Sequence, residues 1–157
     1  MIKPILFHDI DGVLFGYYDG EFQLRAGVKS WLRWAHEHFK IVWLTSRPAE
    51  HIITFLRVVY CEKFLKSSPA PPVQCADWSS YGSKVEWLSQ AIPKLQGRQW
   101  YWIDDEVKYF EKEIKELNLP KDRCIQVSEK GAGALEELRD RLEKLRYDEG
   151  KKTLASR

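Results

Sequence analysis

Four short and almost fully apolar runs divide the chain and constrain its fold more than any other feature. They occupy residues 5–8, 41–44, 100–103 and 124–127. Runs of this length that are apolar on both faces are typical of strands in a parallel sheet that helices cover on each side. Segments with the 3.6-residue spacing of amphipathic helices lie between and after them, at 27–39, 107–117 and 135–145. This alternation of strands and helices predicts a three-layer α/β fold with a parallel sheet.

Polar residues follow three of these runs, at the point where each predicted strand ends. Asp9 and Asp11 come after the first run, Thr45 after the second, and a carboxylate pair at 104–105 after the third. The carboxyl ends of parallel strands open into the crevice where α/β proteins bind ligands. Carboxylates at this edge serve as metal ligands, as acid–base groups, or as both, whereas the structural alternative for Asp9 and Asp11 is a turn-forming pair. His8 alternates to the opposite face of the strand, so we expect it to pack in the core.

A lysine at the start of a predicted helix adds a positive charge to this set. Ser83 and Glu86 have the spacing of a capping box, which places Lys84 in the first helical turn. A lysine there opposes the helix dipole, so an anionic ligand at this end would suit it better than the helix does. The alternative is a lysine whose ammonium group is simply solvated.

The order of these residues, D-x-D, then Thr, then Lys, then a carboxylate pair, resembles the haloacid dehalogenase-like (HAD) superfamily. Most members of that superfamily are magnesium-dependent phosphohydrolases. The resemblance covers about residues 5 to 128 and implies a Rossmann-like parallel sheet (HAD-like), with strands 41–44 and 100–103 on either side of the first. Through its size and its segment 24–27, the chain is weakly similar to small capless modules found beside RNA-repair enzymes. The matching residues are Asp9 and Asp11 in the first motif, Thr45 in the second, Lys84 in the third, and Asp104 with Asp105 in the fourth.

The resemblance implies a mechanism for the hydrolysis of a phosphomonoester. Asp9 would attack phosphorus to form an aspartyl-phosphate, and Asp11 would protonate the leaving oxygen and then activate water. The Thr45 hydroxyl and the Lys84 ammonium group would bind the transferring phosphoryl oxygens. Ser46 is the alternative to Thr45 for this contact, since either hydroxyl can instead cap the following helix.

The same resemblance implies Mg²⁺ as the cofactor. Its ligands would be the Asp9 carboxylate, the backbone carbonyl of Asp11, and Asp104. Asp105 would bind the metal, orient a metal-bound water, or cap the next helix. The four carboxylates and Lys84 carry a net charge of −3, so repulsion should raise the pKa of at least one carboxyl group. Metal binding must then expel protons, and we expect the metal affinity to fall below about pH 5–6.

The spacing of the motifs bears on the substrate. In this superfamily a cap domain inserted after the first or the second motif usually sets specificity. The 35 residues between Asp9 and Thr45 and the 38 between Thr45 and Lys84 leave no room for one. By analogy, an open site suits a large phosphorylated substrate such as a nucleic-acid end or a phosphoprotein. Trp78 and Tyr81 precede Lys84 and are placed to touch such a substrate.

Three other functions share parts of this pattern. A receiver-like phosphoacceptor domain also gathers an acidic cluster, a hydroxyl residue and a lysine around Mg²⁺. Its acidic pair precedes the lysine, whereas here Asp104 and Asp105 follow Lys84. A carbon–halogen hydrolase of the same superfamily needs no proton donor at the position of Asp11. A catalytically silent binding domain would not need the full set of groups, and it stays open as an alternative together with the phosphoacceptor.

Composition bounds the domains, the partners and the compartment. We expect one domain at residues 1–148 and a disordered basic tail at 149–157. The net charge of +2 is too small to argue for nucleic acid by itself. Cys61, Cys75 and Cys124 are an odd number without C-x-x-C spacing, so we expect reduced thiols, no zinc site and a cytoplasmic protein. No long apolar stretch opens the chain, so we expect neither secretion nor a membrane span.

Overall fold

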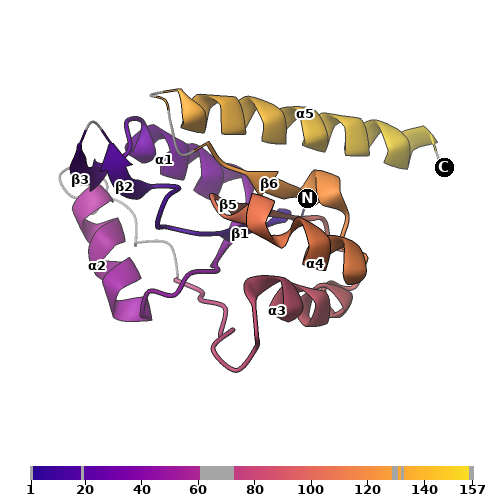
Figure 1. Ribbon diagram of the computed structural model, residues 1–157. Helices are drawn as coiled ribbons and strands as arrows, with labels where there is room; N and C mark the ends of the chain where they lie inside the picture. The colour runs from indigo at the N-terminus through magenta and orange to yellow at the C-terminus, as the bar shows by residue number, and fades with distance from the viewer. Residues whose placement is uncertain (1, 19, 61–72, 129–130, 132, 156–157) are drawn as a thin grey trace.

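The protein has an α/β fold built on a four-stranded parallel sheet that is flanked by helices (Figure 1). The computed structural model describes residues 2–18, 20–60, 73–128, 131 and 133–155. The strands are β1 (Ile5–His8), β4 (Lys40–Trp43), β5 (Trp100–Asp104) and β6 (Cys124–Gln126). Their order in the sheet is β4-β1-β5-β6. This order confirms the predicted α/β fold, is compatible with a Rossmann-like arrangement, and places the first strand between the two strands expected beside it.

The register of the sheet brings the carboxyl ends of three strands to the same edge. His8 of β1 pairs with Trp43 of β4 on one side and with Ile103 of β5 on the other. All residues of β1 and β5 are buried, as expected for strands that are apolar on both faces. Asp104, at the end of β5, pairs with Gln126 of β6. The residues that follow β1, β4 and β5 therefore emerge side by side.

Helices on the two faces of the sheet enclose two separate hydrophobic cores. The α-helices are α1 (Val28–His38), α2 (Ala49–Tyr60), α3 (Lys84–Ala91), α4 (Glu111–Glu116) and α5 (Ala134–Ala155). Helices α1, α2 and α5 enclose the first core with Leu6 and Tyr101 of the sheet, and α3 and α4 enclose the second with Phe7 and Trp102. Figure 1 shows α1 and α5 on one side of the strands and α3 and α4 on the other. Successive residues of a strand thus point into different cores.

Short 3₁₀ turns interrupt two of the predicted helices. The helix that begins at Lys84 passes into a 3₁₀ turn at Ile92–Leu95. Pro93 causes this change, because it has no N–H to continue the α-helical hydrogen bonds. The predicted helix at 107–117 is divided into the 3₁₀ turn Val107–Phe110 and α4.

A β-hairpin connects β1 to α1. Strand β2 (Phe15–Tyr18) pairs antiparallel with β3 (Glu21–Leu24). The hairpin is tied to the loop that follows β1, because the Gly12 N–H donates to the Phe15 carbonyl at 2.7 Å. Figure 1 shows the hairpin beside α2, at the opposite end of the molecule from the C-terminus.

The stretch before α3 pairs only briefly with the sheet. Its pairing is a single parallel bridge between Cys75 and Trp43. Cys75 is exposed and Cys124 is buried, and neither is in a disulfide. Cys61 lies outside the described residues.

The C-terminal helix is longer than the sequence suggested. We expected a disordered tail from residue 149, but α5 continues to Ala155. Gly150 costs the helix about 1 kcal/mol relative to alanine. Glu149 offsets this cost, because its carboxylate accepts hydrogen bonds from the Tyr101 hydroxyl at 2.7 Å and from Arg123 at 2.6 Å. Within the described ranges, no helix combines the length and the apolar character that crossing a membrane requires.

Candidate active site

The edge formed by the ends of β1, β4 and β5 gathers residues that are far apart in the sequence. Asp9 follows β1, and its N–H donates to the Ile103 carbonyl at 3.2 Å, which keeps Asp9 beside β5. Asp104 is the last residue of β5, and its side chain is completely buried. On the other side of β1, Thr45 lies just beyond β4 and is buried as well. The parallel register alone brings these three residues together.

The Lys84 ammonium group lies between two buried carboxylates. Its Nζ is 3.0 Å from Oδ2 of Asp9 and 2.8 Å from Oδ2 of Asp104. Burial alone would lower the pKa of Lys84, but the two carboxylates outweigh this effect and raise it. The predicted N-cap is confirmed, because Ser83 Oγ accepts a hydrogen bond from the Glu86 N–H at 3.0 Å. This cap fixes the first turn of α3 and directs the lysine toward the ends of β1 and β5.

Three carboxylates meet beside Lys84. One oxygen each of Asp9, Asp104 and Asp105 lie within 4.8 Å of one another. Burial, followed by repulsion from Asp104, raises the pKa of Asp9 to about 7, and Lys84 only partly opposes this rise. The same two causes raise the pKa of Asp105 to about 6. Buried carboxylates held this close together favour a cation in their midst, and their oxygen atoms are the ligands that Mg²⁺ prefers.

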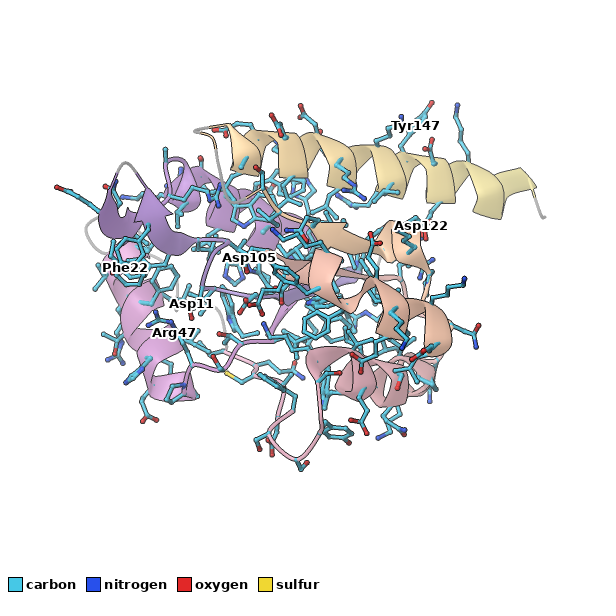
Figure 2. The ribbon with its side chains drawn as sticks, in the orientation of Figure 1. Asp11, Phe22, Arg47, Asp105, Asp122 and Tyr147 are labelled. Atoms are coloured by element: carbon cyan, nitrogen blue, oxygen red, sulfur yellow. The ribbon has the colours of Figure 1, made fainter. Side chains whose placement is uncertain are left out.

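The Asp11 side chain is held by an arginine. Arg47 Nε donates to Asp11 Oδ2 at 2.8 Å, and a terminal nitrogen of the same guanidinium donates to Oδ1 at 2.6 Å. Figure 2 shows Arg47 reaching Asp11 from the loop before α2. Among the described residues, the carboxylate cluster comprises Asp9, Asp104 and Asp105, so the side chain of Asp11 is outside it. Thr45-Ser46-Arg47-Pro48 thus supplies a partner for Asp11 that sequence reasoning did not assign.

The loop between Asp9 and the hairpin is shaped by a glycine and a buried arginine. Gly12 has φ +71°, and a Cβ at this position would lie 1.8 Å from Oδ2 of Asp105. Only glycine therefore lets the Asp105 carboxylate approach this backbone. A terminal nitrogen of Arg25 donates to the Gly12 carbonyl at 2.8 Å, and the Arg25 side chain is buried. No sequence pattern indicated this role for Arg25, whereas the glycine directly after D-x-D was a detectable signal.

Thr45 and Trp78 close the site on the side of β4. Thr45 Oγ1 accepts a hydrogen bond from the Arg47 N–H at 3.3 Å, while the neighbouring Ser46 is exposed. The Trp78 indole N–H donates to the Thr45 carbonyl at 3.0 Å, and its ring centroid is 5.9 Å from Lys84 Nζ. Trp78 is partly buried and packs against the second core, so it covers the lysine in addition to facing the site. Nothing observed here tests its expected contact, or that of Tyr81, with a substrate.

His8 packs in the core, as predicted. The Trp31 indole N–H donates to His8 Nε2 at 2.9 Å, and Nδ1 hydrogen-bonds the Asp9 carbonyl. An Nε2 that accepts a hydrogen bond carries no proton, so Nδ1 holds the single proton of a neutral ring and donates it. Burial lowers the pKa of His8 to about 3. His8 therefore supports the backbone of Asp9 and is not an acid–base group at neutral pH.

The structure brings all six expected site residues to one edge of the sheet, in three different settings. Asp9, Asp104 and Asp105 form the acidic cluster, Lys84 bridges two of its members, and Thr45 lies just beyond the end of the neighbouring strand β4. Asp11 lies in the adjoining loop, in an ion pair with Arg47. Comparison of the chain with models of protein families, with curated proteins and with solved structures found no match.

Proposed function

We propose that the protein is a magnesium-dependent phosphohydrolase with a HAD-like fold, which cleaves phosphomonoesters through an aspartyl-phosphate on Asp9. One observation carries this proposal. The Lys84 ammonium group is shared by the buried carboxylates of Asp9 and Asp104, at the edge where the sheet presents its strand ends. A buried lysine beside a cluster of carboxylates is suited to a ligand that brings both a cation and an anion.

The charge of the site supports a divalent cation. Asp9, Asp104, Asp105 and Asp11 carry four negative charges, and Lys84 with Arg47 carries two positive charges. Two negative charges remain, which is the charge that one Mg²⁺ neutralises. When bound, Mg²⁺ would supply positive charge to the phosphoryl oxygens. The residues that would hold it are the three members of the acidic cluster, together with the backbone carbonyl of Asp11 inferred from the family resemblance.

The roles of the remaining groups follow from their positions. Asp9 is the nucleophile, because β1 presents its carboxylate beside Lys84 at the open end of the strand. Lys84 favours the ionised form of this carboxylate, against burial and the repulsion from Asp104, and would then stabilise the negative oxygens of the transferring phosphoryl group. Thr45 lies just beyond the end of β4, and its hydroxyl, which accepts the Arg47 N–H, would donate its own hydrogen to a phosphoryl oxygen.

Asp11 is the acid–base group of this proposal, and Arg47 controls when it can act. Both oxygens of the Asp11 carboxylate accept hydrogen bonds from the Arg47 guanidinium, so neither faces a leaving group while this pair is in place. Asp11 can donate a proton only after Arg47 turns to another partner. A phosphoryl dianion is such a partner, since guanidinium groups bind carboxylate and phosphate with the same geometry. Substrate binding would thus release Asp11 for proton transfer.

An open site without a cap domain is part of the same proposal. Between Asp9 and Thr45 the chain forms the hairpin, α1 and β4. Between Thr45 and Lys84 it forms α2 and the stretch that contains Trp78, with residues 61–72 outside the described ranges. An uncapped site admits phosphorylated groups on large molecules, including nucleic-acid ends.

The ion pair of Asp11 and Arg47 also favours a second candidate, a domain that accepts a phosphoryl group and keeps it. If Arg47 does not release Asp11, no group is in place to activate water against the aspartyl-phosphate. The chain would then behave as a receiver-like phosphoacceptor or as a silent magnesium-binding domain. The lifetime of the phosphorylated protein separates the hydrolase from the phosphoacceptor.

The test measures phosphate release from an aryl phosphate and from phosphorylated oligonucleotides, with Mg²⁺ and with a chelator. Turnover that requires Mg²⁺ and is lost in Asp9→Asn is the expected result. Asp122→Asn is the matched control, because Asp122 is an exposed aspartate on a 3₁₀ turn away from the site (Figure 2). If a small phosphodonor labels Asp9 stoichiometrically without turnover, the hydrolase is rejected in favour of the phosphoacceptor. If the protein shows no labelling and no turnover, both the hydrolase and the phosphoacceptor are rejected.

A further inference from the structure

The hairpin carries a row of aromatic side chains that the proposed reaction does not use. Phe15 and Tyr17 are two residues apart on β2 and share one face, and Phe22 lies opposite Tyr17 on β3. The ring centroids of Phe15 and Phe22 are 4.4 Å apart, and those of Tyr17 and Phe22 are 5.2 Å apart. These three rings form one continuous surface, the aromatic strip.

The exposure of the side chains increases along the aromatic strip. Phe15 packs partly against the first core, whereas Phe22 is 50% exposed and Tyr17 is 78% exposed. Aromatic side chains gain more from burial than most others, so exposed neighbours of this kind mark a surface for a ligand. An aromatic partner can stack on Phe22 and Tyr17 in the same way as these rings contact each other.

The aromatic strip begins at the border of the candidate active site. Phe15 forms a bridge with Asp11, and its carbonyl accepts the Gly12 N–H at 2.7 Å. The Arg47 guanidinium, which binds the Asp11 carboxylate, lies 5.7 Å from the centroid of the Phe15 ring. Figure 2 shows Phe22 on the same side of the molecule as Asp11 and Arg47. The aromatic strip therefore leads outward from the place where the leaving group of a bound phosphomonoester would lie.

We propose that the aromatic strip binds the nucleobase of the substrate, so that the protein acts on nucleoside phosphates. This inference rests on the proposed phosphohydrolase function and narrows its substrate class. In an aryl phosphate or a phosphotyrosine, the ring is bonded directly to the phosphate oxygen. The exposed rings of Phe22 and Tyr17 are instead separated from Arg47 by the ring of Phe15. A nucleotide has a sugar between phosphate and base, which supplies this separation.

Stacking defines what the aromatic strip can select. Every base has a flat π-face, so stacking on aromatic side chains distinguishes nucleotides from other phosphates without distinguishing one base from another. The strip thus accounts for a substrate class and leaves the identity of the base open to other contacts. A free nucleotide and a nucleotide at the end of a strand present the same base and sugar.

The test compares substrates that differ only in the base. Nucleoside 5′- and 3′-monophosphates and the corresponding ribose phosphates are assayed for phosphate release in the presence of Mg²⁺. We expect kcat/KM for the nucleotide to exceed that for the ribose phosphate by about tenfold, mainly through KM. Tyr17→Ala and Phe22→Ala should each bring this ratio close to one. Phe22→Leu should do the same, and because it keeps an apolar side chain in the hairpin it guards against a loss of folding.

Tyr147→Ala is the control for the aromatic variants. Tyr147 is 62% exposed on α5, far from the hairpin in Figure 2, and its substitution should leave the ratio unchanged. Equal kcat/KM for nucleotide and ribose phosphate, or a ratio that Phe22→Leu and Tyr17→Ala do not change, overturns the inference. In that case, turnover of an aryl phosphate that is lost in Asp9→Asn would still uphold the proposed function.

A binding measurement separates the two proposals if no substrate releases phosphate. Titration calorimetry with the nucleotide and the ribose phosphate then reports the aromatic strip alone. Tighter binding of the nucleotide that is lost in Phe22→Leu would uphold the nucleobase site and reject hydrolysis, and equal binding would reject both. Oligonucleotides with a terminal phosphate form the last arm. If kcat/KM for the oligonucleotide is higher than for the mononucleotide, the substrate is a strand end. If it is lower, the substrate is a free nucleotide.

Discussion

Replacing Asp9 by asparagine should stabilise the metal-free protein while it abolishes turnover. The cause is the acidic cluster, in which Asp9 is buried next to Asp104 and shares Lys84 with it. Asparagine has nearly the same shape but no charge, and its amide can donate a hydrogen bond to the Asp104 carboxylate. The substitution therefore removes repulsion and leaves the packing in place.

The magnitude follows from the pKa of Asp9, which is raised from 3.8 to about 7. At pH values between 3.8 and about 7, Asp9 carries a proton in the folded protein but not in the unfolded chain. This contribution to stability is present below about pH 4 and is lost as the pH rises through about 7. One pKa unit corresponds to about 1.4 kcal/mol, so the loss at pH 8 is at most about 4 kcal/mol. Asp9→Asn also removes one of the two carboxylate partners of Lys84, which offsets part of this gain. We therefore expect the free energy of unfolding of Asp9→Asn to exceed that of the native protein by about 1–3 kcal/mol at pH 8.

Urea unfolding in the presence of a chelator measures this gain. Tryptophan fluorescence follows the transition, since the chain has seven tryptophans. We expect Asp9→Asn to be more stable than the native protein at pH 8 and about equal to it at pH 4.5. Addition of Mg²⁺ should stabilise the native protein at pH 8 more than the variant. The exposed control Asp122→Asn should change the free energy of unfolding by less than about 0.5 kcal/mol.

Two results would refute this reasoning. The first is a variant that is less stable than the native protein at pH 8 without metal. The second is a gain of the same size at pH 4.5 and at pH 8. Either result would mean that burial and repulsion do not destabilise the ionised form of Asp9. The main argument for a metal site at the acidic cluster would then be refuted.

The metal affinity, Arg47 and Gly12 each give a further expectation. Protons must leave Asp9 and Asp105, whose pKa values are raised to about 7 and about 6, so the affinity for Mg²⁺ should fall by about tenfold or more per pH unit below pH 6. Equal affinities at pH 5 and pH 8 in titration calorimetry would contradict this. Arg47→Ala should slow an alkyl phosphate and an aryl phosphate by a similar factor of about tenfold or more, because the variant loses a ligand of the phosphoryl dianion while Asp11 is free to donate its proton. A loss confined to the alkyl phosphate would contradict this, since it would mean that Asp11 needs Arg47 in order to act. Gly12→Ala should lower the free energy of unfolding by about 2 kcal/mol or more, through positive φ and the clash with Asp105. Gly97→Ala has a similar φ of +79° and nothing within 4 Å of its Cβ, so it should cost only about 1 kcal/mol, and equal losses in urea unfolding would disprove the contact.

The strands were predictable because they are apolar on both faces. Every residue of β1 and β5 is buried, and only a sheet covered by helices on each side gives strands that environment. The end of a helix was harder to place. The capping box at Ser83 predicted the start of α3 but not its end, where Pro93 turns the chain into a 3₁₀ helix. The tail was misjudged because the interaction that holds it, from Glu149 to Tyr101 and Arg123, joins residues far apart in the sequence.

The site was predictable only in part, for a similar reason. Residues that end strands could be assigned to one edge, since parallel register fixes where strand ends meet. The partners of those residues could not be assigned, because they depend on the conformations that long side chains adopt. Arg47 reaches Asp11 across 36 positions, and Arg25 reaches the Gly12 carbonyl from beyond the hairpin. Neither contact leaves a periodic or spaced pattern in the sequence.

The hydrogen bonds of His8 determine how a pH–rate profile of this protein would be interpreted. Histidine is the residue to which an inflection between pH 5 and pH 8 is usually assigned. The ring beneath Asp9 keeps one proton throughout that interval, because its pKa is about 3 and the Trp31 N–H occupies its other nitrogen. The histidine that supports the backbone of Asp9, the proposed nucleophile, thus has the same protonation state from pH 5 to pH 8. An inflection in that range would therefore not come from His8, whereas the carboxyl groups of Asp9 and Asp105, with pKa values raised to about 7 and about 6, titrate within it.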